Sequence, residues 1–200
     1  MIDEEVGEPK PFMGATWEIA RRIVHTSADF SLLDSLHLPK EAIEAGVTAL
    51  LYGATVYTDT EMVRSGIPIR RLEPLRSRAI CLLSLPNVTE TARTLSITRS
   101  RAALRAAGNI VSGNILAVGN APTTLIALSE LLDEGLPPPA LVIAMPVGFV
   151  NAAESKELIL GYPAVPCIAI RGRRGGSPLA AATVNALAEL ALRRKGISAE

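Results

Sequence analysis

The chain has few residues of the kinds that mark many functional classes. Its 200 residues include two cysteines, two histidines and 4% aromatic residues. Cys81 and Cys167 both lie inside apolar runs, which predicts two small buried side chains and neither a disulfide nor a metal site. Asp59 and Glu61 have no further His, Cys or acidic residue in a ligand pattern beside them. We therefore expect no metal centre.

The sequence also lacks a net charge and a long apolar run. A formal net charge of zero argues against a general nucleic-acid binder or a membrane-surface binder. No apolar run reaches the roughly 18 to 20 residues of a membrane-spanning helix. Residues 1–10 are acidic and lack the apolar core of a signal peptide. We expect a soluble, cytoplasmic protein that binds no nucleic acid and no membrane.

What the chain does contain is apolar and β-branched residues in short, regularly spaced runs. Hydrophobic residues make up 48% of the sequence, and 200 residues suit one domain (1–200) with a sizeable core. Continuous apolar runs of this length are typical of strands buried on both faces of a parallel sheet. The five predicted strands are Thr55–Tyr57, Ala79–Leu83, Asn114–Val118, Leu141–Met145 and Pro166–Ile170.

The segments between these runs are long enough for crossover helices. Alternating strands and helices predict an α/β fold, a doubly wound five-stranded parallel sheet with helices on both faces. The predicted helices are Thr89–Ala107, interrupted at Thr98–Ser100, and Pro122–Glu134, Asn151–Leu160 and Ser177–Arg194.

His25 is the most informative single residue. The apolar residues of Thr16–Val24 recur at helical spacing, which places His25 near the C-terminal end of a helix, where the helix dipole favours a positive charge. Histidine is the side chain best suited to donate a proton near neutral pH. A buried or helix-capping role is the alternative, and position alone does not separate the two. The only other histidine is His37.

Small, polar or glycine-rich loops follow the predicted strands, where open α/β sheets bind their ligands. Arg171–Ser177 leads directly into a helix, so its N–H groups and arginine forks would attract an anion. Its glycine spacing matches neither dinucleotide-binding nor phosphate-loop motifs. A ligand with several carboxylates explains sixteen arginines against four lysines, although a solvated basic turn and a base composition rich in G and C are alternatives. No G-x-S-x-G segment suggests a hydrolase.

Taken together, these segments resemble the precorrin-8X methylmutase family of cobalamin biosynthesis. The resemblance runs from about Thr16 to Ala188 in unbroken order. The matching segments are His25–Phe30, Tyr57–Met62, Ser65–Ile67, Ile97–Ser100, Val118–Thr123, Pro146–Val150, Ala153–Lys156, Arg171–Ser177 and Val184–Leu187.

The resemblance implies a flavodoxin-like fold and a cofactor-free isomerase that moves a methyl group from C-11 to C-12 of (cobalt-)precorrin-8. It also implies a homodimer with substrate sites near the subunit interface. The family's catalytic histidine falls on His25, and Arg99 matches an arginine expected to contact a substrate side chain. The expected substrate-binding residues are Thr26, Thr58, Asp59, Glu61, Arg99, Ser100, Asn120, Ala121, Pro122, Thr123, Gly148, Glu154, Lys156, Arg171, Gly172, Arg173, Gly175, Gly176 and Ser177.

Two features of the match bear on the substrate. The sequences of His25–Phe30 and Tyr57–Thr60 resemble those of family members that act on cobalt-containing substrates more than those of members that act on metal-free substrates. Family members usually have a longer N-terminal region, with a serine that approaches the substrate, whereas 24 residues precede His25 here. This shortened segment, about residues 1–15, makes a non-catalytic corrinoid carrier one alternative. A nucleotide-binding flavodoxin-like module is another, because fold does not fix function.

Overall fold

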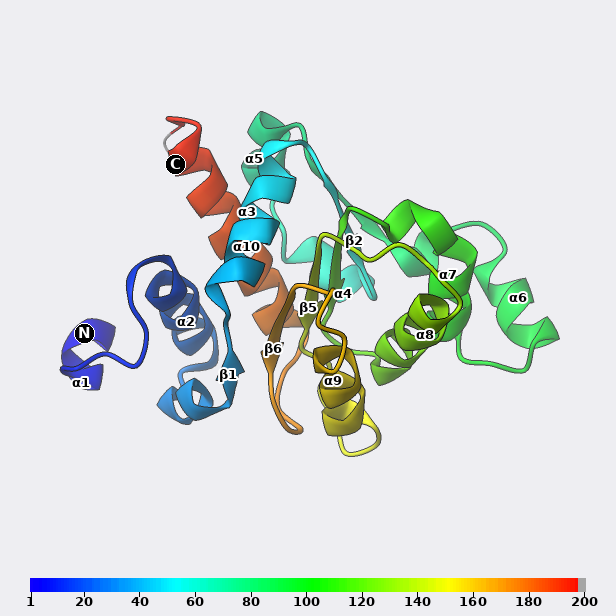
Figure 1. The fold of residues 1–200 in the computed structure, drawn as a ribbon, viewed down its shortest axis with the longest axis horizontal. Coiled ribbons are helices and arrows are strands. Elements are labelled where there is room, and N and C mark those ends of the chain that lie inside the picture. Colours follow the sequence, from blue (N-terminus) through cyan, green and yellow to red (C-terminus); the bar gives the residue numbers. More distant parts are fainter. Residues whose placement is uncertain (198–200) are drawn as a thin grey trace.

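A computed structural model describes residues 1–197 of the chain. One six-stranded sheet lies between two layers of helices (Figure 1). The strands are β1 (Leu36–His37), β2 (Thr55–Thr58), β3 (Arg78–Cys81), β4 (Ile115–Val118), β5 (Leu141–Ala144) and β6 (Cys167–Ile170). The main helices are α1 (Ile2–Val6), α2 (Gly14–Ser27), α3 (Lys40–Leu51), α4 (Glu61–Ser65), α5 (Ile69–Leu72), α6 (Val88–Thr94), α7 (Arg99–Ala107), α8 (Pro122–Asp133), α9 (Ala152–Leu160) and α10 (Ser177–Arg194).

The sheet has the strand order β1-β6-β5-β4-β2-β3. All pairs from β6 to β3 are parallel, and the first parallel strand, β2, lies between the second and the third. This is the flavodoxin-like order, which confirms the predicted fold class. The predicted strand count was wrong by one, because β1 pairs antiparallel with β6. Two residues carry too little apolar pattern to reveal such a strand.

Alternate residues of the central strands supply two separate hydrophobic cores. Ile115 and Ala117 of β4 face one core, whereas Leu116 and Val118 face the other. The first core lies under α2, α3 and α10, and the second lies under α6 to α9. Figure 1 shows α2, α3 and α10 on one side of the sheet and α7 and α8 on the other. Burial on both faces explains the continuous apolar runs of the sequence.

The helix predictions hold with one division, whereas α1, α3, α4 and α5 were not predicted. The stretch 89–107 forms two helices, because the side chain of Thr98 caps α7 by accepting a hydrogen bond from the N–H of Arg101. Sequence analysis did not identify α3, although Ala42, Ile43 and Val47 follow helical spacing and are buried. Within residues 1–197, no helix combines the length and apolar composition needed to cross a bilayer.

Candidate active site

The carboxylate of Asp59 connects the loops that follow β2 and β4, the strands between which the chain order of the sheet reverses. It accepts hydrogen bonds from the backbone N–H groups of Gly119, Asn120 and Ala121 at 3.0, 2.8 and 2.7 Å. The side chain is buried, which raises the pKa of its carboxyl group, while the three N–H groups oppose that rise. Its neighbour Thr58 is also buried and donates its hydroxyl to the carbonyl of Thr60 at 3.1 Å. Both residues therefore fix the backbone of these loops through hydrogen bonds.

The N-terminus of α10 packs directly against the loop after β4. A Cβ atom on Gly119 would lie 2.7 Å from the Cα of Ser177, so only glycine allows this approach. The hydroxyls of Ser177 and Thr60 lie 3.4 Å apart. The ends of β2 and β4 therefore meet the first turn of α10, where the helix dipole favours an anion.

The segment Arg171–Ser177, here called the arginine loop, is held close to the end of β5. Gly176 donates its N–H to the carbonyl of Met145 at 2.8 Å, and Gly148 donates to the carbonyl of Arg173 at 3.1 Å. A Cβ atom on Gly175 would overlap the carbonyl oxygen of Met145. These contacts give the loop one backbone path across the carboxyl edge of the sheet.

Lys156 supports the arginine loop from beneath. Its side chain, on α9, is fully buried, and its ammonium group donates to the carbonyl oxygens of Gly172 and Arg174 at 2.8 and 2.6 Å. Burial lowers the pKa of Lys156 to about 8. The ammonium group thus contacts the loop's backbone and does not point into open space.

The three arginines of the loop have different partners. Arg171 pairs with Glu157 at 3.4 Å in an exposed ion pair. Arg174 donates to Asp29 at 2.7 Å. The guanidinium of Arg173 lies 5.7 Å from the ring centre of Phe149, which is itself 86% exposed, and it pairs with no carboxylate among residues 1–197. Arg173 is therefore the loop cation best placed to accept a carboxylate from a ligand.

His25 lies in the last turn of α2, as the sequence predicted, and its side chain is exposed. Helix α2 packs along α10, and an ion pair between Arg22 and Glu189 joins the two helices. A pocket of about 510 Å³ borders His25. Besides Met1, it is lined by residues of α1, α2 and α10, namely Ile2, Asp3, Glu18, Arg21, Arg22, Ala186 and Glu189.

The remaining predicted site residues lie on α2, α4, α7, α8 and α9 and have local partners of their own. A hydrogen bond of 3.0 Å between the hydroxyls of Thr98 and Thr123 brings Arg99 and Ser100 beside the start of α8. Glu61 is exposed, and its carboxylate accepts hydrogen bonds from Arg64 at 2.5 Å and Ser84 at 2.9 Å. These two hydrogen bonds lower the pKa of Glu61. The predicted positions also include Thr26, whose hydroxyl donates to the carbonyl of Arg22, Pro122 in the first turn of α8, and exposed Glu154 in the first turn of α9.

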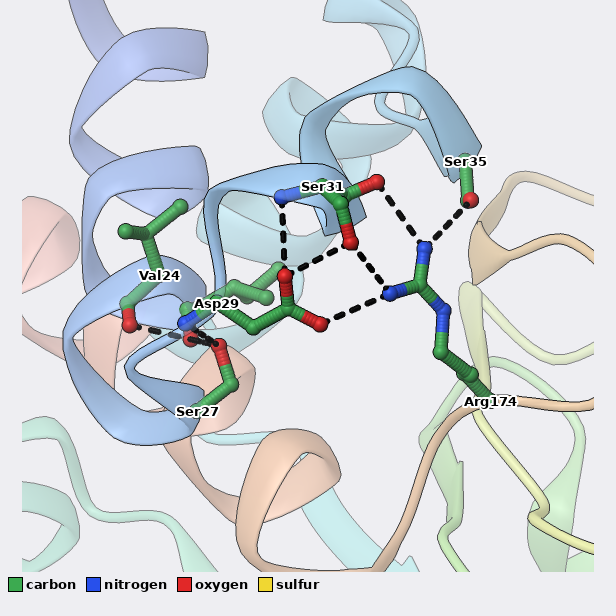
Figure 2. A network of polar contacts seen from close by, with 7 residues as sticks. Val24, Ser27, Asp29, Ser31, Ser35 and Arg174 are labelled. Atoms are coloured by element: carbon green, nitrogen blue, oxygen red, sulfur yellow. Dashed lines mark hydrogen bonds and ion pairs between the residues drawn. The ribbon is translucent and has the colours of Figure 1, made fainter. Parts of the chain in front are cut away.

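Sequence analysis missed the residues that join His25 to the arginine loop. Arg174, Asp29, Ser31 and Ser35 form one polar network between the loop and the segment after α2 (Figure 2). Arg174 and Asp29 are 145 positions apart in the chain, so no local pattern pairs them. The only available signal was an acidic residue just beyond a helix end and a third arginine in the loop.

Comparison with known proteins decides the family. The family model described as "Precorrin-8X methylmutase" matches residues 1–190. This chain belongs to the precorrin-8X methylmutase family. The "Cobalt-precorrin-8 methylmutase" of Priestia megaterium is 42% identical over 96% of this chain and 84% of its own length. The "Precorrin-8X methylmutase" of Pseudomonas aeruginosa is 44% identical over 86% of this chain and 82% of its own.

A solved precorrin-8X methylmutase from Thermus thermophilus has the same fold, with a TM-score of 0.87 and 39% identity over 96% of this chain and 94% of that chain. Membership confirms the predicted enzyme class, an isomerase of cobalamin biosynthesis whose family reaction moves a methyl group from C-11 to C-12 of the macrocycle. Relatives bearing the cobalt and the metal-free names match at similar identity, so identity does not choose between the substrates. Within residues 1–197, no three His, Cys, Asp or Glu side chains are arranged to hold a metal ion.

Proposed function

We propose that this methylmutase binds the carboxylates of (cobalt-)precorrin-8 at the carboxyl edge of the sheet and isomerises it with His25 as the general acid. The observation that carries this proposal is the Arg174 network, which holds the exposed His25 end of α2 beside the arginine loop. A proton donor and a carboxylate-binding surface thus belong to one continuous structure. The product is the corresponding hydrogenobyrinate or cobyrinate.

The reaction needs no co-reactant from the protein. The bond from the methyl group to C-11 breaks as the bond to C-12 forms, and the double bonds of the macrocycle shift, so the atoms balance within one molecule. By analogy with the family, the imidazolium of His25 hydrogen-bonds to or protonates the conjugated system near ring C. This makes the acceptor carbon more electron-poor. Histidine suits this role because its ordinary pKa, about 6.5, is close to a neutral working pH.

The rim of the macrocycle carries carboxylates, and several groups at this edge can receive them. Arg173 pairs with no carboxylate within residues 1–197, and Arg99 is exposed at the start of α7. The helix dipole at the N-terminus of α10 adds a partial positive charge at this edge. Asp59 and Lys156 then act by holding the receiving loops in place, since each is bonded to loop backbone.

A His25→Ala variant tests the catalytic role, with His37→Ala as the matched control. General acid catalysis contributes about 10²- to 10⁴-fold, so we expect His25→Ala to lose at least that much methyl migration while still binding the corrinoid. His37→Ala should turn over normally. The assay follows the spectral change on mixing with metal-free and with cobalt-containing precursor, and we expect the cobalt substrate to react faster. Wild-type turnover in His25→Ala would refute the role.

The double substitution Arg171→Leu with Arg173→Leu tests carboxylate binding. Hydrogen bonds to charged groups contribute about 1.5 to 3 kcal/mol each, so the pair should weaken corrinoid binding about 10²- to 10⁴-fold. Arg78 is the first residue of β3 and so lies at the amino edge of the sheet, opposite the carboxyl edge that carries the arginine loop. As the control, Arg78→Leu should bind the corrinoid normally. Added salt should weaken wild-type binding. Normal corrinoid binding by the double variant, with loss of ATP or NAD binding, would favour the nucleotide-binding alternative.

Binding without any spectral conversion by the wild-type protein would favour the carrier alternative. We further propose a cytoplasmic homodimer with two sites near its interface, because closed two-fold assembly is the commonest oligomer and the family uses it. Residues 1–15 would then form part of the substrate wall, which is supported by the position of Ile2 and Asp3 in the lining of the pocket beside His25. Light scattering at micromolar concentration should report a dimer, and a single 21.1 kDa species would contradict it.

A further inference from the structure

We propose that Arg174 is a positioning residue, which fixes the His25 end of α2 relative to the arginine loop. This inference rests on the proposed role of His25 and extends it to a residue that contacts neither the imidazole nor the expected carboxylates. Its consequence is that substrate held by the loop and the proton donor on α2 keep one fixed separation.

The guanidinium of Arg174 bridges to one short segment with both of its terminal nitrogens. One nitrogen donates to the carboxylate of Asp29 and the hydroxyl of Ser31, both at 2.7 Å. The other donates to the carbonyl of Ser31 at 2.9 Å and the hydroxyl of Ser35 at 3.3 Å. Figure 2 shows this fork spanning the space between the loop and the turn after α2. Four acceptors on one planar group fix its orientation as well as its position.

The connection from Asp29 back to His25 is short and well bonded. Three residues separate them, and one of these, Ala28, adopts the left-handed conformation that ends α2 while its N–H donates to the carbonyl of Val24 at 2.8 Å. The hydroxyl of Ser27 donates to the carbonyl of Ile23 at 3.0 Å and accepts from the N–H of Asp29 at 3.2 Å. A shift of Asp29 is therefore transmitted to the last turn of α2.

The loop end of the bridge is equally fixed. Lys156 holds the carbonyl of Arg174 itself at 2.6 Å. Arg174 thus joins a loop anchored on β5 and α9 to a helix end that packs on α10. One backbone bond, from the N–H of Arg171 to the carbonyl of Ser35 at 2.8 Å, remains when the side chain of Arg174 is removed. Loss of the Arg174 side chain should therefore change the orientation of the His25 end of α2 without separating it from the arginine loop.

The solvent exposure of the network indicates that it positions the end of α2 and contributes little to the stability of the fold. The side chains of Arg174 and Asp29 are 44% and 40% exposed, and solvent-exposed ion pairs contribute little to folding. A misplacement of about 1 Å at a catalytic group, however, can reduce a rate about 10²-fold. Removing the fork should therefore affect turnover far more than unfolding.

The test compares Arg174→Met with Arg173→Met, two neighbouring substitutions that remove the same charge. We expect Arg174→Met to lower kcat about 10- to 100-fold with KM changed less than threefold and the midpoint of urea unfolding nearly unchanged. Arg173→Met should raise KM and leave kcat close to wild type. Arg174→Lys should be intermediate, because one ammonium cannot reach all four acceptors. In a double variant with Asp29→Asn, the loss should be no larger than that of Arg174→Met alone.

A readout independent of activity is available because the chain has only two histidines. The imidazole Cε1–H signal of His25, assigned in NMR spectra with His37→Ala, should shift or broaden in Arg174→Met and stay in place in Arg173→Met. Wild-type kcat together with an unmoved His25 signal would overturn the positioning role. So would additive losses in the double variant. If His25→Ala is fully active, the catalytic proposal fails, whereas the NMR result still judges whether Arg174 orients the helix end.

Discussion

Replacement of Asp59 should destabilise the protein to a degree that its contacts allow us to work out. Asp59→Ala removes the acceptor of three backbone N–H groups. Asn120 is exposed, so water can solvate its N–H, but Gly119 and Ala121 are buried and would be left unsatisfied. Each buried unsatisfied donor costs about 1 to 3 kcal/mol, so the expected loss in the free energy of unfolding is about 2 to 6 kcal/mol.

Asp59→Asn should be milder, because its one carbonyl oxygen can occupy the place of Oδ2 and keep the bonds to Asn120 and Ala121. Its NH₂ group would then face the N–H of Gly119, donor against donor, at a cost of about 1 to 3 kcal/mol. Urea unfolding followed by circular dichroism measures both variants. The exposed Asp34→Asn is the control and should stay within about 0.5 kcal/mol of wild type. An Asp59→Asn variant as stable as wild type would refute the reasoning.

Two further predictions concern the support of the arginine loop. The pKa of Lys156 is about 8 in the folded chain against 10.5 for a free lysine, so the buried positive charge costs the fold stability below pH 8, and this cost is relieved as the pH rises from about 8 to 10.5. The free energy of unfolding of wild type minus that of Lys156→Met should therefore rise across this window, by at most about 1.4 kcal/mol per pH unit, and a flat difference would contradict the lowered pKa. Gly175→Ala should cost more than 2 kcal/mol in urea unfolding and displace the loop, because its Cβ would lie 2.8 Å from the carbonyl carbon of Met145. Gly172→Ala, with no atom within 4 Å of its Cβ and a φ of +76°, should cost only about 1 kcal/mol, and equal losses would show that backbone overlap is not the cause.

The sequence predicted the parts of the fold that local pattern determines. The apolar run Leu141–Met145 marked β5 to within one residue, and Ser177–Arg194 marked α10 at both ends. It also placed His25 at a helix end. Strand β1 escaped notice because two residues next to a 3₁₀ helix (Phe30–Ser35) form no recognisable alternation.

The candidate site was less predictable because its contacts join distant parts of the chain. The family resemblance suggested that Asp59 and Lys156 contact substrate, and in the structure both are bonded to loop backbone, Asp59 across 60 positions and Lys156 across 16 to 18. The chemistry of a carboxylate or an ammonium group does not reveal whether its partner is a substrate or the protein itself. Only the folded arrangement decides that, as it does for Arg174.

The position of α10 has a consequence for how the chain folds during synthesis. Thirteen of its 18 residues are buried, and it lies at the centre of the helical layer formed with α2 and α3. Because α10 follows every strand in the chain, the ribosome has produced the whole sheet before the helix that covers one face exists. Until Arg194 emerges, the part of that face which α10 covers beside α2 and α3 is apolar surface open to association with other chains. We therefore expect nascent chains stalled between β6 and α10 to aggregate or bind chaperones, unlike chains released with α10 complete.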